Sequence, residues 1–245
     1  MTPSKRARAS SPRGRAGGAA APNADVPLTA PVEDYLKAIY AIEQAGDAAG
    51  TNEVATRLSI AAASVSGMVR RLADQGHVSY ERYRGVRLTE AGRRAALKTI
   101  RRHRVIEAYL AKALGYAWDR VHEEAERLEH AASDELIDKM AEAIGEPRTD
   151  PHGHPIPTRD GTIDETPHRT LSDLAAGQRS RVKRVSDEDS ELLRYLAKIG
   201  IRPGVQVMLT ERAPFDGPLT LRVGKGSVQV GLALASRVMV EILPD

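Results

Sequence analysis

The fold of the N-terminal half is decided by residues 51–88, which read TNEVATRLSIAAASVSGMVRRLADQGHVSYERYRGVRL. The apolar spacing predicts a short helix over 52–58 and a second helix over 61–75, closed by Gly76. Two short strands follow, over 77–81 and 86–88, around the turn RYRG. A helix, a turn, a second helix and a two-stranded hairpin in this order predict a winged helix-turn-helix.

The second of these helices has one apolar face and one face suited to a polyanion. Val65, Val69 and Leu72 recur at helical spacing and are expected to be buried. The opposite face is small at its start and basic further on, and the hairpin tip is basic again. Hydroxyls can bind phosphates or base edges and arginines neutralise phosphates, so the pattern favours double-stranded DNA as a partner. The predicted DNA contacts are Ser64, Ser66, Arg70, Arg71, Arg82 and Arg84.

The rest of the chain divides by its periodicity. Residues 90–145 are almost wholly helical, with junctions near Gly115 and Ser133, whereas strands with Gly and Pro turns follow from 171, around one helix over 190–199. We therefore predict a mainly α protein with a β C-terminal domain built as a small barrel. The expected segments are a disordered basic tail over 1–27, the winged helix-turn-helix over 28–92, a helical domain over 93–146, a linker over 147–170 and the β-domain over 171–245.

The composition excludes several classes of protein. None of the 245 residues is cysteine, which rules out disulfides, thiolate zinc sites and thiol nucleophiles and fits a reducing cytoplasm. No apolar run approaches the length of a membrane span, and the N-terminus lacks the apolar middle of a secretory signal. We expect a cytoplasmic protein with no membrane partner. The net charge of +3 permits nucleic-acid binding.

Residues 121–132 carry most of the ionisable chemistry. Val121, Ala125 and Leu128 form an apolar stripe, and a second stripe beside it holds His122, Glu126, Glu129 and His130. Carboxylates held together at the edge of a core repel one another unless a cation neutralises them. A second pair, His103 and Glu107, has the i, i+4 spacing that can grip one cation. Glutamate-rich helices are also common without metal, so the spacing alone leaves a structural role open.

Several motifs together resemble the diphtheria-toxin-repressor family of metal-dependent transcriptional regulators, in its manganese-responsive branch with a C-terminal SH3-like domain. The motifs are EDYLKAIY at 33–40, YERYRG at 80–85, HEEAERLEH at 122–130 and DPHG with PIP at 150–157. The resemblance runs from residue 31 to the C-terminus. It implies a homodimeric repressor that is not an enzyme and that binds operator DNA when divalent metal ions are bound.

The resemblance also implies two sets of ligands. The primary metal site maps onto Asp34, Glu126, Glu129 and His130. The ancillary site maps onto His103, Glu107 and His122, with Asp189 as the best match for a carboxylate from the SH3-like domain. His152 and His154 fall in a stretch that the family match makes a connecting turn.

Asp34 and Glu126 decide the expected metal. Iron-type members place methionine and cysteine at these two positions, whereas this chain offers hard oxygens, so Mn²⁺ is the expected cofactor and Fe²⁺ the alternative. Shorter members of the manganese branch pair two metals through a carboxylate at the position of Lys37. A cation there favours two separated sites.

Three other functions are weighed against this one. The first is an iron(II)-responsive regulator of the same family. The second is a winged-helix regulator that senses an organic ligand, which the Glu/His stripe disfavours because such pockets are mostly apolar. The third is a metal-dependent hydrolase, for which the sequence offers no sign of a substrate cleft.

Overall fold

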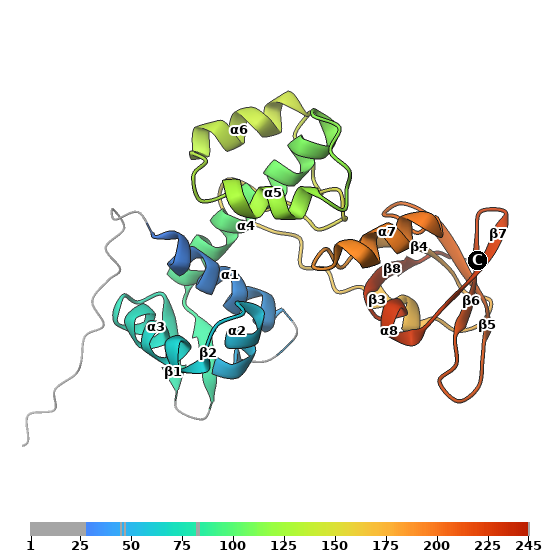
Figure 1. Cartoon of the computed structure of the whole chain (residues 1–245), viewed down its shortest axis with the longest axis horizontal. Helices are drawn as coiled ribbons and strands as arrows, with labels where there is room; N and C mark the ends of the chain where they lie inside the picture. Colours follow the sequence, from blue (N-terminus) through green and yellow to red (C-terminus); the bar gives the residue numbers. More distant parts are fainter. Residues whose placement is uncertain (1–27, 45, 47, 82–83, 245) are drawn as a thin grey trace, which may run out of the picture.

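The computed structural model describes residues 28–44, 46, 48–81 and 84–244. Figure 1 shows three bodies in chain order: a helical domain with a hairpin, a second helical domain, and a β-domain at the far end. The predicted basic tail and Arg82 lie outside the described residues.

The first body is a winged helix-turn-helix. Helices α1 (Ala30–Glu43), α2 (Thr51–Arg57) and α3 (Ala62–Asp74) precede strands β1 (Val78–Glu81) and β2 (Gly85–Leu88), which pair antiparallel. Val65, Val69 and Leu72 are buried in one core with residues of α1, as their spacing predicts. Gly92 allows the next helix to approach closely, since a Cβ there would lie 2.0 Å from the His77 carbonyl oxygen.

The second body is built on one long helix. Helix α4 (Glu90–Lys112) starts at Thr89, whose hydroxyl accepts from Gly92 N, and runs from the first body into the second (Figure 1). Helices α5 (Val121–Leu128) and α6 (Asp134–Ala143) pack on it, and Ser133 caps α6 as expected. Because α5 ends at Leu128, Glu129 and His130 lie just beyond the helix and not within it.

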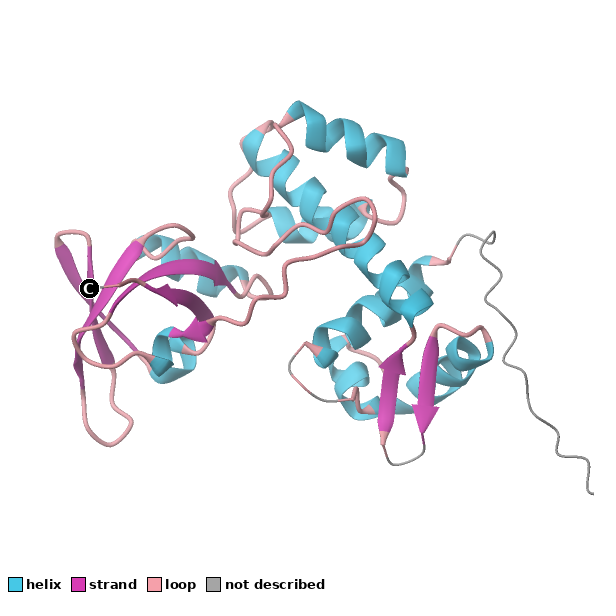
Figure 2. Cartoon of the chain, turned by 180° about the vertical axis from the view of Figure 1, so that it is seen from behind, coloured by secondary structure: helices cyan, strands magenta, loops and turns pink. Residues whose placement is uncertain are grey.

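The third body is an SH3-like antiparallel sheet, so the predicted fold class is confirmed. Its strands are hydrogen-bonded in the order β3-β8-β4-β5-β6-β7, seen from behind in Figure 2. The strands are β3 (Arg169–Thr170), β4 (Arg179–Val185), β5 (Gln206–Arg212), β6 (Leu219–Val223), β7 (Gly226–Val230) and β8 (Val238–Ile242). The helical elements are η1 (Leu171–Asp173), α7 (Ser190–Lys198) and α8 (Leu232–Ala235), of which the sequence predicted only α7. Trp118 of the second body is buried in this domain's core.

The segment between the second and third bodies is docked along its length. Val185 N, at the end of β4, donates to His152 O at 3.0 Å, which ties the turn at 150–154 to the sheet. Further on, Ile163 packs on the core of the first body, and Glu165 accepts hydrogen bonds from Tyr40 and Arg93. The segment therefore touches all three bodies. In the described part of the chain, no helix has the length and apolar character of a membrane span.

Candidate metal centre

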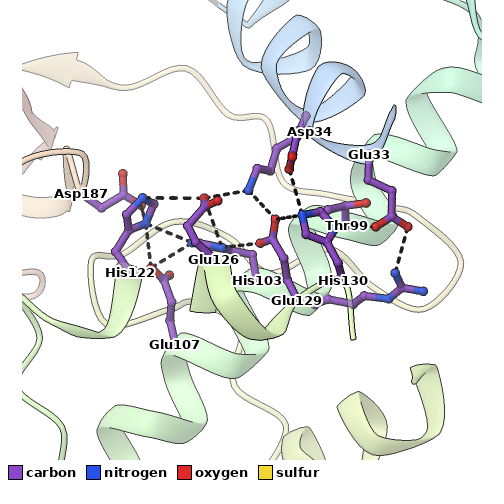
Figure 3. A network of polar contacts seen from close by, with 12 residues as sticks. Glu33, Asp34, Thr99, His103, Glu107, His122, Glu126, Glu129, His130 and Asp187 are labelled. Carbon is purple, nitrogen blue, oxygen red and sulfur yellow. Dashed lines mark hydrogen bonds and ion pairs between the residues drawn. The ribbon is translucent and has the colours of Figure 1, made fainter. Parts of the chain in front are cut away.

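The first cluster joins α1 to the end of α5. His130 Nε2 lies 2.9 Å from Asp34 Oδ1 and 3.3 Å from Glu129 Oε1 (Figure 3). Asp34 comes from α1 of the DNA-binding domain, whereas Glu129 and His130 belong to the central domain. One potential ligand atom from each of the three residues lies within 4.8 Å of the others. The cluster therefore spans a domain boundary.

A lysine occupies the centre of the expected primary site. Lys37 Nζ donates to Glu129 Oε1 at 2.6 Å and to Glu126 Oε1 at 2.8 Å. Burial alone would lower the pKa of Lys37, but the charges of Glu129 and Glu126 raise it. Glu126 is 42% exposed, and its Oε1 lies 3.8 Å from both His103 Nδ1 and His122 Nε2. Its oxygens group with His103 and Glu129 and not with Asp34 and His130. The ammonium thus stands where a metal cation would balance these carboxylates.

Glu33 orients His130, a role that the sequence did not reveal. Glu33 Oε2 lies 2.6 Å from His130 Nδ1, and Glu33 Oε1 accepts from Arg102 at 3.1 Å. A carboxylate on one ring nitrogen turns the other toward a ligand or cation, as is usual for metal-binding histidines. The sequence does place an acidic residue directly before Asp34, and this position could have suggested a second contact with His130.

The second cluster is deeply buried. His103 Nε2 lies 3.1 Å from Glu107 Oε1 and 3.1 Å from His122 Nδ1, and His103 Nδ1 lies 2.6 Å from Glu129 Oε2. The side chains of Glu107 and Glu129 are fully buried. Burial alone would lower the pKa of His103, but Glu107 and Glu129 raise it to about 10. Burial would raise the pKa of Glu107, but its histidine neighbours hold it well below its usual value.

The C-terminal domain places Asp187 beside this cluster, between His122 and His154. Asp187 Oδ2 lies 3.9 Å from His122 Nδ1 and 3.6 Å from His154 Nδ1, and Figure 3 shows it facing His122. Asp189, the residue expected there, instead accepts from the backbone N–H groups of Glu191 and Leu192 and caps α7. The chain leaves β4 at Val185, and this exit places Asp187 against the second cluster and Asp189 at the start of the helix.

Several buried atoms in this region are suited to a cation. Among the residues that the structure describes, no hydrogen-bond partner is found for the buried atoms Glu107 Oε2, Asp150 Oδ2, His152 Nδ1 and His154 Nδ1. An unpaired buried polar atom costs free energy that a bound ion or water would recover. Oxygen and imidazole donors at this density fit a divalent metal of intermediate hardness.

The expected DNA-contact residues lie on the outer face of the first body. Ser64, Ser66, Arg70 and Arg71 are all exposed on α3, and Gly67 between them has open space around its Cα. Arg84 is exposed at the hairpin and pairs with Glu81 at 3.1 Å. The face is accessible and carries few bulky groups, as a helix that enters the major groove requires.

Comparison with known proteins gives the family. Three family models match in series: an iron-dependent repressor N-terminal DNA-binding domain at residues 27–86, an iron-dependent repressor metal-binding and dimerisation domain at 89–158, and a FeoA domain at 169–242. The chain is 30% identical to the iron-dependent repressor IdeR of Mycobacterium tuberculosis over 222 residues, which cover 85% of this chain and 96% of that protein.

Two further relatives agree. The diphtheria toxin repressor of Corynebacterium diphtheriae is 29% identical over 221 residues, covering 86% of this chain and 96% of that protein. The solved structure of a manganese-dependent transcriptional repressor in complex with manganese is 39% identical, with a TM-score of 0.82, and covers 86% of this chain and all of that one. Domain order, fold and site geometry thus lead to one conclusion: this chain belongs to the diphtheria-toxin-repressor family and is a metal-dependent transcriptional repressor, not an enzyme.

Proposed function

We propose that this repressor responds to Mn²⁺, which switches it to the form that binds operator DNA. The observation that carries the proposal is the 2.9 Å contact between His130 Nε2 and Asp34 Oδ1. This contact joins the DNA-binding domain to the central domain through two groups that both ligate divalent metals. A cation held there would fix the orientation of the DNA-binding domain.

The residues of the first cluster act by their charge. Asp34 and Glu129 of this cluster and Glu126 beside it carry three negative charges, which Lys37, His103 and a protonated His130 oppose without metal. A bound divalent cation would neutralise the carboxylates and add bonds across the boundary. Such a ligand needs only a few kcal/mol of differential affinity between two orientations to shift the population strongly.

The ligand types support manganese over iron. Asp34 and Glu126 both supply carboxylate oxygens, and His130 supplies one imidazole. Oxygen-rich sites suit Mn²⁺, a weak binder in the general divalent series, because they offer no soft sulfur ligand to competitors. The manganese-dependent repressor noted above, at 39% identity, is also more similar to this chain than the iron-dependent repressor at 30%.

We further propose that the active form is a homodimer. The matching family model of the central domain is described as a dimerisation domain. Leu128 at the end of α5 and Leu136 on α6 are large apolar side chains that stay exposed in the single chain. Burying them against a second copy would set two α3 helices at a fixed spacing, as a pair of operator half-sites requires.

The test is operator binding under a metal titration. Metal-free protein would be mixed with genomic fragments at fixed ionic strength, and Mn²⁺, Fe²⁺ under anaerobic conditions, Co²⁺ and Zn²⁺ would be added in turn. We expect tight binding only with metal, with Mn²⁺ active at micromolar concentration. Equal binding in strong chelator would contradict the proposal and favour a regulator that senses an organic ligand.

Iron is the second candidate, supported by the iron-dependent repressor of Mycobacterium tuberculosis. If Fe²⁺ activates DNA binding at a lower free concentration than Mn²⁺, the protein is an iron-responsive repressor and the manganese hypothesis is wrong. Exchange of Asp34 for Met and Glu126 for Cys tests the specificity argument directly. The paired variant is expected to shift the preference away from Mn²⁺.

A further inference from the structure

The turn at 150–154 carries a set of metal-ligating side chains of its own. Asp150, His152, His154 and Asp187 each offer one potential ligand atom, and these four atoms lie within 4.8 Å of one another. His152 and the carboxylate of Asp150 are fully buried, and the side chain of His154 is 15% exposed. Three of these residues belong to the turn and Asp187 follows β4, so two distant segments of the chain bring metal-ligating groups together.

Two of these side chains are anchored through one atom, which leaves the other atom directed into the cluster. Asp150 Oδ1 accepts from the backbone N–H groups of His152 and His154, at 2.8 and 3.0 Å. His152 Nε2 lies 2.7 Å from the Trp118 carbonyl oxygen and must donate to it, because a carbonyl only accepts. The remaining Asp150 Oδ2 and His152 Nδ1 are buried, and the described residues provide no hydrogen-bond partner for either.

The backbone holds the turn against the strand that delivers the fourth ligand. Gly153 has a φ of +90°, and a Cβ there would lie 1.9 Å from Lys183 O in β4. Val185 N donates to His152 O at the end of the same strand. Asp187 follows two residues later, so its distance from His154 is set by this close packing. The cluster is therefore held in place by backbone contacts.

Glu107 belongs to the second cluster, with His103 and His122, and it also lies beside His152 of this set. Its Oε1 is 3.1 Å from His103 Nε2, 3.3 Å from His122 Nδ1 and 3.8 Å from His152 Nδ1. Its Oε2 is buried and has no partner among the described residues. A carboxylate with neighbours on both sides and one free oxygen has the geometry of a bridging ligand.

We propose that the ancillary region binds two divalent cations and that Glu107 is the carboxylate shared between them. One cation takes His103, His122 and Glu107, and the other takes Asp150, His152, His154 and Asp187. The donors number four imidazoles and three carboxylates, enough to give each cation at least three protein ligands. Arg104 Nε lies 3.8 Å from Asp150 Oδ2, so two divalent cations and this guanidinium against the three carboxylates leave two positive charges. The carboxylates of Glu126 and Glu129, which lie beside His103, oppose that excess.

The inference rests on the proposed function, because Mn²⁺ would fill both the Asp34 cluster and the ancillary region. It adds that each protomer holds about three ions, one in the Asp34 cluster and two in the ancillary region. His154 is the best residue to test. Its Nδ1 makes no hydrogen bond within the described structure and faces Asp150 Oδ2 at 3.3 Å and Asp187 Oδ2 at 3.6 Å, so its removal takes away a ligand while the backbone bonds of the turn remain.

The experiment is equilibrium dialysis of the full-length protein against Mn²⁺, with metal content measured by mass spectrometry. Wild type is expected to bind about three ions per protomer, and His154→Ala about one ion fewer. Two Mn²⁺ ions that share a carboxylate are magnetically coupled, and this coupling weakens the six-line Mn²⁺ signal in electron paramagnetic resonance. The wild type should therefore show a weakened signal, and His154→Ala should restore it. His168→Ala, which removes a histidine outside the cluster, should match wild type in both readouts.

Asp187→Asn provides a second variant in case His154→Ala folds poorly, with Asp189→Asn as its neighbouring control. Two ions in the wild type, or unchanged content in both cluster variants, would overturn the inference. Operator binding measured on the same samples separates the two claims. Metal-dependent DNA binding with only two ions leaves the proposed function standing, and metal-independent DNA binding removes the proposed function itself.

Discussion

Lys37 Nζ lies 2.6 Å from Glu129 Oε1, and this ion pair joins the first helix of the DNA-binding domain to the central domain. The Glu129 side chain is fully buried, so its charge needs a partner inside the protein. The Lys37 ammonium lies against one of its carboxylate oxygens, and the His103 ring lies 2.6 Å from the other. A metal ion that binds Glu129 and Glu126 must therefore compete with Lys37.

Replacing Lys37 with methionine is expected to tighten Mn²⁺ binding. Methionine is an unbranched side chain one atom shorter than lysine, so the variant keeps most of the packing but removes the competing charge. We expect the dissociation constant at the first cluster to fall about tenfold, roughly 1.4 kcal/mol. A fluorescent chelator competition measures it. Lys139→Met removes an exposed lysine that pairs with Glu142 and should leave the constant unchanged; weaker metal binding in Lys37→Met would mean that the lysine supports the site.

Removing His103 is expected to flatten the pH dependence of stability in the metal-free protein. The pKa of His103 is raised in the fold to about 10 from its ordinary 6.5, so its contribution is complete below pH 6.5 and is lost as pH rises through about 10. Thermal unfolding in chelator should therefore show Tm falling over this window. His103→Gln should show a smaller fall. If Tm falls equally with pH in both proteins, groups other than His103 cause the pH dependence.

Glu165 is expected to hold the linker against the DNA-binding domain. Its Oε1 accepts from Tyr40 at 2.6 Å, Gln44 at 2.9 Å and Arg93 at 2.5 Å. Glu165→Ala should cost about 1 kcal/mol of docking, a modest figure because the side chain is partly exposed. Hydrogen exchange should accelerate over 158–168. Asp164→Ala, which loses only bonds to Thr166, is the control; equal exchange in both variants would contradict the clamp.

Arg70 on α3 is expected to contact a DNA phosphate. Arg70→Ala should weaken binding to all sequences alike and reduce the slope of log affinity against log salt by about 1. Fluorescence anisotropy across a salt series measures both quantities. Arg169→Ala, an exposed arginine in β3, should change neither. A loss confined to one operator sequence would instead make Arg70 a base contact.

Local patterns predicted most of the fold. The apolar spacing of Val65, Val69 and Leu72 predicted the buried face of α3, and the junction expected near Ser133 is the start of α6. Strands β4 to β8 lie in the segment after 171 where strands were predicted, because alternation and Gly or Pro turns are strong local signals. The short elements β3 and α8 were missed, since two to four residues carry too little periodicity.

The candidate site was only partly predictable, because it depends on contacts between distant segments. Residues on one helix, such as His103 and Glu107, were identified by spacing. Asp187 and Asp189 differ by two positions in an acidic run, and only the path of the chain after β4 separates them. The role of Lys37 depends on the packing of α1 against α5, which no local pattern encodes.

The account turns on Asp34 as the link between metal and DNA binding. The most direct measurement is the operator affinity of Asp34→Ala with and without Mn²⁺, beside wild type and Glu90→Ala, an exposed acidic control on α4. We predict that Mn²⁺ raises the affinity of wild type and of the control strongly and leaves Asp34→Ala unchanged, while circular dichroism shows all three folded. An undiminished response of Asp34→Ala at the same Mn²⁺ concentration would contradict the account.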